Sequence, residues 1–350
     1  MRTPGNIGDV ASRLTTEVRA ARELGHETTP VIDDLFLTLG RQALGRSEGS
    51  FFNLIDSSLL TGDLRPESVD HHRTILQPNA VTSEEVEKTL GLVDLMLGPQ
   101  AGVLTEQFKN YAETNEIFAR MQAGEKFLVV SNHLELPDQG FTLGLWQKAA
   151  RDEGLDRLEH QLTVIIGRLI GYYQLGDTNV MDGILRKAGS VLKTFPVSGT
   201  EKLDEASTEA IAKLRLFRKI CNERSKDALR DLMTSPEGRM VCMAGSGTQD
   251  RFDPTDGAVH MEPFGSGTCE MIIDSSTHGA TVIPLFADYA PDHSIVRILP
   301  PIQPKSLVTR ADCDEIGRQI AGEGSHARGA AYAEHPDIER FFHPIIYNER

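Results

Sequence analysis

The chain has 350 residues, of which 39% are hydrophobic and 25% are charged, and its formal net charge is −15 at pH 7. This composition is that of an ordinary soluble globular protein, so a disordered chain is not expected, and the length allows one large domain and a smaller one. The strong negative charge argues against general nucleic-acid binding.

The first hundred residues have the spacing of helices. Apolar residues recur three and four positions apart in the segments DVASRLTTEVRAARELG, PVIDDLFLTLGRQALG and SEEVEKTLGLVDLMLG. This spacing is typical of amphipathic helices, and Gly25 and Gly45 are suitable residues to end the first two. We therefore expect a small helical domain over residues 1–100.

From residue 126 onwards, short apolar runs predict strands. The runs are KFLVVSNH, LTVIIG, VLKTFPV, RMVCMAG and ATVIPLFADYA, and the first has the continuous apolar character of a strand buried on both faces. Helical sequence separates several of them, most clearly at residues 208–233. The alternation predicts an α/β domain over residues 101–350, with a mixed, largely parallel central sheet flanked by helices.

A polar segment with His133 follows the first predicted strand. Ligands of α/β sheets bind beyond the carboxyl ends of the strands, so His133 is a candidate catalytic base. Imidazole, with an unperturbed pKa of ~6.5, can take a proton from an alcohol when its second nitrogen is held as a donor. Asp138 could hold it, because Pro137 favours a turn from strand into helix, and Asn132 could steady the turn. A turn whose histidine has no catalytic role is the alternative.

A second polar segment, MAGSGTQDRFDPTDG, follows the predicted strand at residues 239–245. The glycines around Ser246, including Gly247, can expose backbone amides to an anion, and Arg251 could clamp a phosphate or carboxylate. The alternative is a glycine-rich surface turn closed by DPTDG. No G-x-S-x-G sequence surrounds Ser246, so we do not expect a nucleophilic serine.

Taken in order, VVSNHLELPDQG, MAGSGTQDRFDP, MEPF and ATVIPLFADYA resemble segments of the soluble, plastid-type glycerol-3-phosphate 1-O-acyltransferases. That family belongs to the H-x4-D glycerolipid acyltransferase superfamily. The resemblance covers residues 50–305 and implies a helical unit ahead of an α/β domain. It also implies transfer of a fatty acyl group from an acyl-ACP or acyl-CoA thioester to the sn-1 hydroxyl of glycerol 3-phosphate, which gives lysophosphatidic acid. The thioester is a co-substrate, and no cofactor is implied.

By this resemblance, His133 would deprotonate the acceptor hydroxyl, Asp138 would orient His133, and Arg251 would contact the phosphate. The acyl group would pass directly from the thioester to the acceptor, and Asn132 and Ser246 would have supporting roles.

The chain departs from the family pattern at two places. Gln249 occupies the position of the first arginine in the family's GGRDR segment, and no Lys-His pair follows the predicted strand at residues 191–197. Gln249 can donate a hydrogen bond but carries no charge. Lys202 and Arg168 are the residues that could supply positive charge instead. The acceptor is therefore glycerol 3-phosphate or a different alcohol or amine, and a non-catalytic lipid- or carrier-protein-binding protein is the other alternative.

A basic segment interrupts the acidic chain. Residues 213–230 hold seven basic and two acidic side chains, a local net charge of +5. A positive surface can steer an acidic partner, so this segment is a candidate donor-binding patch for acyl carrier protein or for the phosphates of coenzyme A. The alternative is a solvated helix face. The residues proposed for the patch are Lys213, Arg215, Arg218 and Lys219.

The sequence predicts no metal centre. His133, Glu135 and Asp138 are possible ligands, but the H-x-E start of the zinc deaminases requires a downstream P-C-x-x-C, and neither this nor H-E-x-x-H occurs. The four cysteines form no CxxC pair, which fits a reducing compartment.

We expect a soluble, cytoplasmic protein, or a stromal one in a plant or alga. The N-terminal MRTPGNIGDV lacks the apolar core of a signal peptide, and no window approaches 18 apolar residues. A lysophosphatidic acid product would partition into membranes, so peripheral membrane contact is expected.

Overall fold

A computed structural model describes residues 90, 93–94, 97–134, 138–159, 161–167, 191–193, 226–227, 229–246, 250–290 and 292–348. Helices and strands alternate along much of this part of the chain, which confirms an α/β fold. The expected helical domain lies outside the described residues, except for helical residues between 90 and 100.

The helices that the structure describes in full are α6 (Pro99–Asn110), α7 (Ala112–Gln122), α8 (Asp138–Asp152), α9 (Asp156–Glu159), α12 (Ser266–Thr277) and α13 (Arg310–Glu334), with a 3-10 helix η3 (Glu339–Phe342). The strands are β1 (Lys126–Ser131), β2 (Leu162–Gly167), β3 (Val191–Lys193), β4 (Arg239–Ala244), β5 (Arg251–Asp253), β6 (Ala258–Met261), β7 (Thr281–Asp288), β8 (Ile295–Ile298) and β9 (Ile345–Tyr347).

The central sheet has the strand order β3-β2-β4-β1-β7-β8. Strand β1 pairs in parallel with β4 and with β7, so that Ser131 lies opposite Ala244 on one side and Leu285 on the other. Strand β8 runs antiparallel to β7. The predicted mixed, largely parallel sheet is confirmed, and all five predicted strands belong to it.

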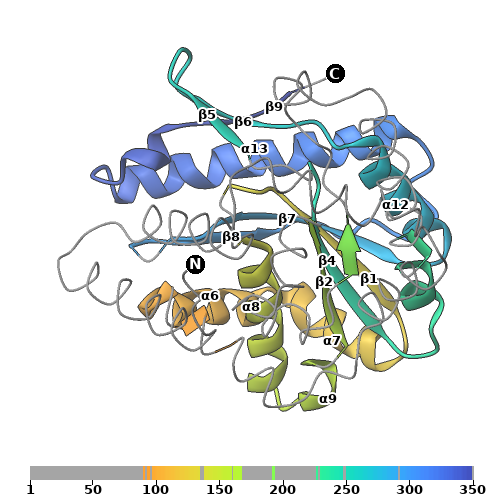
Figure 1. Ribbon diagram of the computed structural model, residues 1–350. Coiled ribbons are helices and arrows are strands. Elements are labelled where there is room, and N and C mark those ends of the chain that lie inside the picture. The colour runs from red at the N-terminus through yellow and green to blue at the C-terminus, as the bar shows by residue number, and fades with distance from the viewer. Residues whose placement is uncertain are drawn as a thin grey trace, which may run out of the picture.

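Both faces of the central strands are covered, as their continuous apolar sequence predicts. Phe127, Leu128, Val129 and Val130 of β1 have no exposed surface, because helices pack on either side of the sheet. In Figure 1, α13 lies on one side of β7 and β8, and α6 and α8 lie on the other. Trp146 of α8 is fully buried with its ring edge-on to Phe108, at 4.9 Å between ring centroids. Its role is core packing.

A smaller sheet, with the order β5-β6-β9, lies beyond the central one. The DPTDG sequence closes the β5–β6 hairpin, and Gly257 adopts the positive φ of 71° that such a turn requires. The C-terminal tail enters as β9, parallel to β6. An ion pair between Arg328 of α13 and Asp288 of β7, at 2.8 Å and with both side chains buried, connects α13 to the end of the central sheet.

Described residues ahead of residue 100 pack on the α/β domain. Val93 and Leu97 belong to the same buried apolar cluster as β1, and Asp94 forms an ion pair with Lys148 of α8 at 2.8 Å. The predicted domain boundary near residue 100 therefore does not interrupt the core at these positions.

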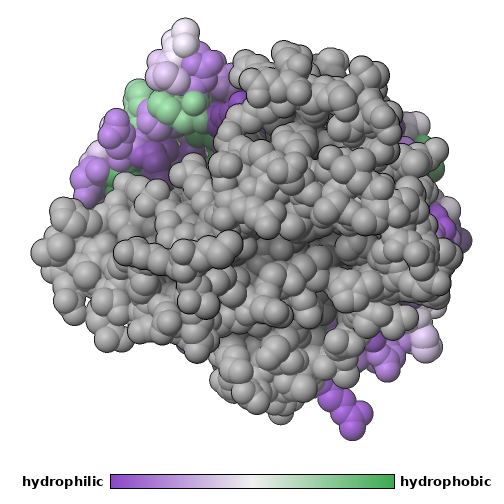
Figure 2. Space-filling model, viewed as in Figure 1, coloured by the Kyte–Doolittle hydropathy of each residue, from purple (hydrophilic) through white to green (hydrophobic). Residues whose placement is uncertain are grey.

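The described surface seen in Figure 2 is mainly hydrophilic, with a small hydrophobic area at the upper left. Exposed large apolar side chains include Phe252 of β5, Phe342 of η3 and Ile346 of β9. Among the described residues, no helix has the length and apolar content needed to cross a membrane.

Candidate active site at the end of strand β1

His133 and Asp138 lie together at the carboxyl end of the central strand β1. The strand ends at Ser131, His133 follows two residues later, and Asp138 is the first residue of α8. The distance from His133 Nδ1 to Asp138 Oδ2 is 3.7 Å, and the two side chains are 9% and 3% exposed. This separation exceeds the ~2.7–3.2 Å of a hydrogen bond, but such bonds are often long before substrate binds. The structure thus brings the predicted base and its predicted carboxylate into one buried site.

Asn132 extends the pairing of β1 with β7 beyond the end of the strand. Its side-chain Nδ2 donates to the carbonyl oxygen of Ala287 at 2.7 Å, and its Oδ1 accepts from the backbone N–H of Ala287 at 2.8 Å. A primary amide has both a donor and an acceptor, so it can replace a peptide group in this position. The partner is the backbone of β7 rather than the turn itself. The residue before His133 is consequently tied to the neighbouring strand.

Asp250 contacts His133 from the side of β1 that faces away from β7, and its role was not predicted from the sequence. Its backbone N–H donates to the carbonyl oxygen of His133 at 2.6 Å, and its Oδ2 accepts from the backbone N–H of His133 at 2.9 Å. Asp250 lies on the β4 side of β1, because the carbonyl of Ser131, two residues before His133, accepts from Gly245 at the end of β4. The only signal in the sequence was an acidic residue between Gln249 and Arg251, in a polar segment after a buried strand.

The burial of Asp250 changes its ionisation. Desolvation raises the pKa of this carboxyl from 3.8 to about 7, and the nearby Asp138 carboxylate also raises it. The backbone amides of His133 and Glu262 and the charge of His133 act in the opposite direction. Asp250 Oδ1 is buried and has no hydrogen-bond partner among the described residues. The site therefore holds two buried carboxyl groups close to one imidazole.

Tyr289 lies close enough to Asp138 for the two groups to interact electrostatically. Its hydroxyl is 2.9 Å from the hydroxyl of Thr142 in α8, and its ring lies edge-on to Phe141. Burial raises the pKa of Tyr289, and the Asp138 carboxylate raises it further, so the phenol stays neutral. Aromatic packing keeps this side of the site apolar.

Glycine at position 245 is required by close packing. The backbone N–H of Gly245 donates to the carbonyl oxygen of Ser131 at 2.9 Å, which prolongs the β1–β4 pairing. A Cβ at this position would lie 2.1 Å from Cε1 of Phe264, far inside van der Waals contact. Ser246 follows and is buried, while Gly247 and Gln249 of the predicted anion loop lie outside the described residues.

Of the predicted phosphate-binding residues, the structure describes Arg251. It is the exposed first residue of β5 and directly follows Asp250. Lys202 and Arg168 lie outside the described residues, as does the predicted donor-binding patch of Lys213, Arg215, Arg218 and Lys219.

The end of the basic segment carries paired charges. Lys226 contacts Glu270 of α12, and Arg230 contacts Asp274 of α12 at 3.2 Å. These two positive charges are thus offset by acidic residues of the neighbouring helix. They contribute less to a positive surface than the sequence count suggests.

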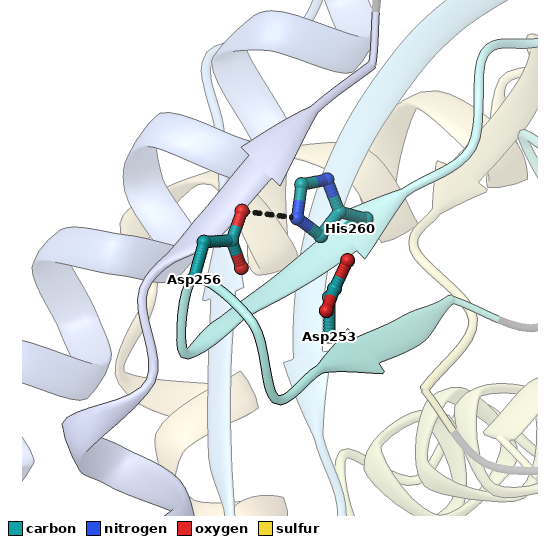
Figure 3. Close-up of side chains that lie close together, drawn as sticks. All are labelled: Asp253, Asp256 and His260. Atoms are coloured by element: carbon teal, nitrogen blue, oxygen red, sulfur yellow. Dashed lines mark hydrogen bonds and ion pairs between the residues drawn. The ribbon is translucent and has the colours of Figure 1, made fainter.

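One group of side chains in the described residues could hold a metal ion: Asp253, Asp256 and His260, on the β5–β6 hairpin (Figure 3). Their ligand atoms lie within 4.8 Å of one another. The two ring nitrogens of His260 already face oxygens, of Asn348 and Asp256, each at 2.8 Å. These two hydrogen bonds raise the pKa of His260, and a metal-binding histidine must be deprotonated. The arrangement suits an imidazolium that joins the hairpin to the C-terminal tail.

No family model matches the chain, and no curated protein is a significant match to it. Its function must therefore be inferred from its residues and their geometry. At the end of β1 the structure places an imidazole beside a buried carboxyl group, a combination suited to the removal of a proton from a hydroxyl group.

Proposed function

We propose that the protein is an acyltransferase that moves a fatty acyl group from an acyl-ACP or acyl-CoA thioester to the sn-1 hydroxyl of glycerol 3-phosphate. The observation that carries the proposal is the buried His133–Asp138 pair, 3.7 Å apart, at the carboxyl end of a central parallel strand. The order of the motifs supports the same reaction through their resemblance to the soluble glycerol-3-phosphate acyltransferases.

The position of Asp138 indicates which nitrogen of His133 carries the proton and which one can act as the base. Because Nδ1 is the nitrogen next to the carboxylate, the tautomer with the proton on Nδ1 is favoured, and Nε2 carries the lone pair. In the proposed reaction Nε2 takes the proton of the acceptor hydroxyl, and the hydroxyl oxygen attacks the thioester carbonyl carbon. When the tetrahedral intermediate collapses, the carbon–sulfur bond breaks, and the departing thiolate receives the proton from Nε2. No acyl-enzyme intermediate is formed.

Arg251 supports a phosphorylated acceptor. Arg251 follows Asp250, and Asp250 is hydrogen-bonded to His133. The backbone of Arg251 is therefore next to the site. A guanidinium binds phosphate through two parallel hydrogen bonds. Gln249, in place of a family arginine, makes other alcohols or amines the alternative acceptors.

Direct assay tests the proposal. The purified full chain is incubated with palmitoyl-ACP or palmitoyl-CoA and radiolabelled glycerol 3-phosphate, and labelled lysophosphatidic acid is separated by chromatography. We expect His133→Ala to lower turnover by a factor of roughly 10²–10⁴, the usual contribution of a general base.

His278→Ala is the matched control. His278 follows α12, just ahead of the first residue of β7, and so lies at the opposite end of the sheet from His133. This variant should turn over normally. Normal turnover by His133→Ala would refute the mechanism. Acylation of glycerol or an amine in preference to glycerol 3-phosphate would refute glycerol 3-phosphate as the acceptor.

A further inference from the structure

One residue holds both peptide groups of His133. Asp250 donates its backbone N–H to the His133 carbonyl and accepts the His133 N–H at its carboxylate, although 117 positions separate the two residues. On the other side, Asn132 is bonded to Ala287 of β7 through both side-chain atoms. Beyond the end of β1, the side chains of Asp250 and Asn132 thus form hydrogen bonds in place of the regular backbone pairing between strands.

Asp250 also adds a negative charge to the site when it ionises. Among the described residues, the groups that act on its ionisation are the charges of His133 and Asp138 and the backbone N–H groups of His133 and Glu262, and Asp138 also acts on the phenol of Tyr289. Two buried carboxylates near each other repel, and a positive charge close to both offsets that repulsion by attracting each of them. Such a charge arises on the imidazole of His133 whenever it takes a proton.

We propose that Asp250 is a positioning residue for His133: its carboxyl group fixes the His133 backbone and, when ionised, stabilises the imidazolium form of His133 as a second buried negative charge near Asp138. The catalytic consequence rests on the proposed acyltransferase function, whereas the effect on the imidazole does not.

The physical reason is the location of the turn. A buried backbone N–H needs an acceptor, and His133 has left the β-ladder that would supply one. A carboxylate acceptor forms a stronger hydrogen bond than a neutral carbonyl, and its charge acts over a longer range in a buried site. Asp250 therefore combines a geometric and an electrostatic effect in one side chain.

Asp250→Asn separates the two effects. The asparagine oxygen can still accept the His133 N–H, but the negative charge is lost. Histidine labelled with ¹³C reports the imidazole titration by NMR, with the resonance assigned from its absence in His133→Ala. We expect the pKa of His133 to be lower in Asp250→Asn than in the unmodified chain by up to about one unit, because the Asp250 charge is only partly present while His133 titrates. The acidic limb of the kcat/KM profile should move to lower pH by the same amount.

Asp337→Asn is the control, because it removes the same charge from an exposed residue. It should leave the titration of His133 and the pH profile unchanged. An unchanged pKa of His133 in Asp250→Asn, in a folded protein, would overturn the proposal.

The NMR titration of His133 tests the proposal even if the chain shows no acyl transfer or the Asp250→Asn variant does not fold. If the unmodified chain acylates no acceptor, the proposed function is wrong, while the NMR comparison still decides the role of Asp250. If Asp250→Asn does not fold, the unmodified chain is titrated alone. Coupled groups titrate in two steps, so a two-step curve for His133 supports the proposal and a single step at ~6.5 overturns it.

Discussion

Ionisation of Asp250 should destabilise the folded protein. Burial raises the pKa of this carboxyl from 3.8 to about 7, so the folded state binds the proton more tightly than the unfolded state does. The contribution to stability is full below pH 3.8 and is lost as the pH rises to about 7. Each pH unit between the two pKa values corresponds to ~1.4 kcal/mol, which gives a loss of about 4 kcal/mol, roughly 3 kcal/mol of it above pH 5.

Asp250→Asn removes this ionisable group. The buried amide NH₂ adds a cost of about 1–3 kcal/mol if it finds no acceptor, but this cost does not depend on pH. The free energy of unfolding of the variant, relative to that of the unmodified chain, should therefore rise by about 3 kcal/mol between about pH 5 and pH 8.

Urea unfolding followed by the fluorescence of Trp146, the single tryptophan, measures this difference. The comparison is repeated in a His133→Ala background, because imidazole titrates over the same pH range. Asp337→Asn, which removes an exposed carboxylate, should follow the unmodified chain across the range. A constant difference between Asp250→Asn and the unmodified chain at all pH values would refute the reasoning.

Two further substitutions, at Gly245 and Asn132, test the packing and the hydrogen bond that place His133. Gly245→Ala should lower the free energy of unfolding by about 1–3 kcal/mol, because its Cβ would lie 2.1 Å from the ring of Phe264, whereas Gly267→Ala, whose Cβ meets nothing within 4 Å, should not. Equal melting temperatures for the two variants would contradict this. Asn132→Asp should cost about 1–3 kcal/mol and lower turnover, because a carboxylate cannot donate to the carbonyl of Ala287. Unchanged thermal unfolding and turnover would show that this bond does not position the turn.

The sequence was most informative where a strand is buried on both faces. Strands β1, β4 and β7 are continuous apolar runs, and each was predicted within two residues of its structural bounds. Strands β5, β6, β8 and β9 have only three or four residues each. In so short a strand no alternation of apolar and polar residues can be recognised, and β5 is largely exposed.

Only the contacts between residues close in sequence could be predicted at the site. His133 and Asp138 are five positions apart, so the turn between them was sufficient to expect their contact. The contacts of His133 with Asp250 and of Asn132 with Ala287 join residues more than a hundred positions apart. They depend on which strands flank β1, and local spacing does not contain the strand order.

The position of β1 in the middle of the sheet has a consequence for folding. Its neighbours β4 and β7 begin at residues 239 and 281, so the ribosome releases the apolar KFLVVS segment more than a hundred residues ahead of either partner. Until then both edges of the segment are unpaired, a state that favours aggregation, and pairing over such sequence separations is slow. His133 acquires its surroundings only when β7 has joined β1, because Ala287 holds the preceding residue. Recovery of activity during refolding would therefore report completion of the sheet rather than collapse of the chain.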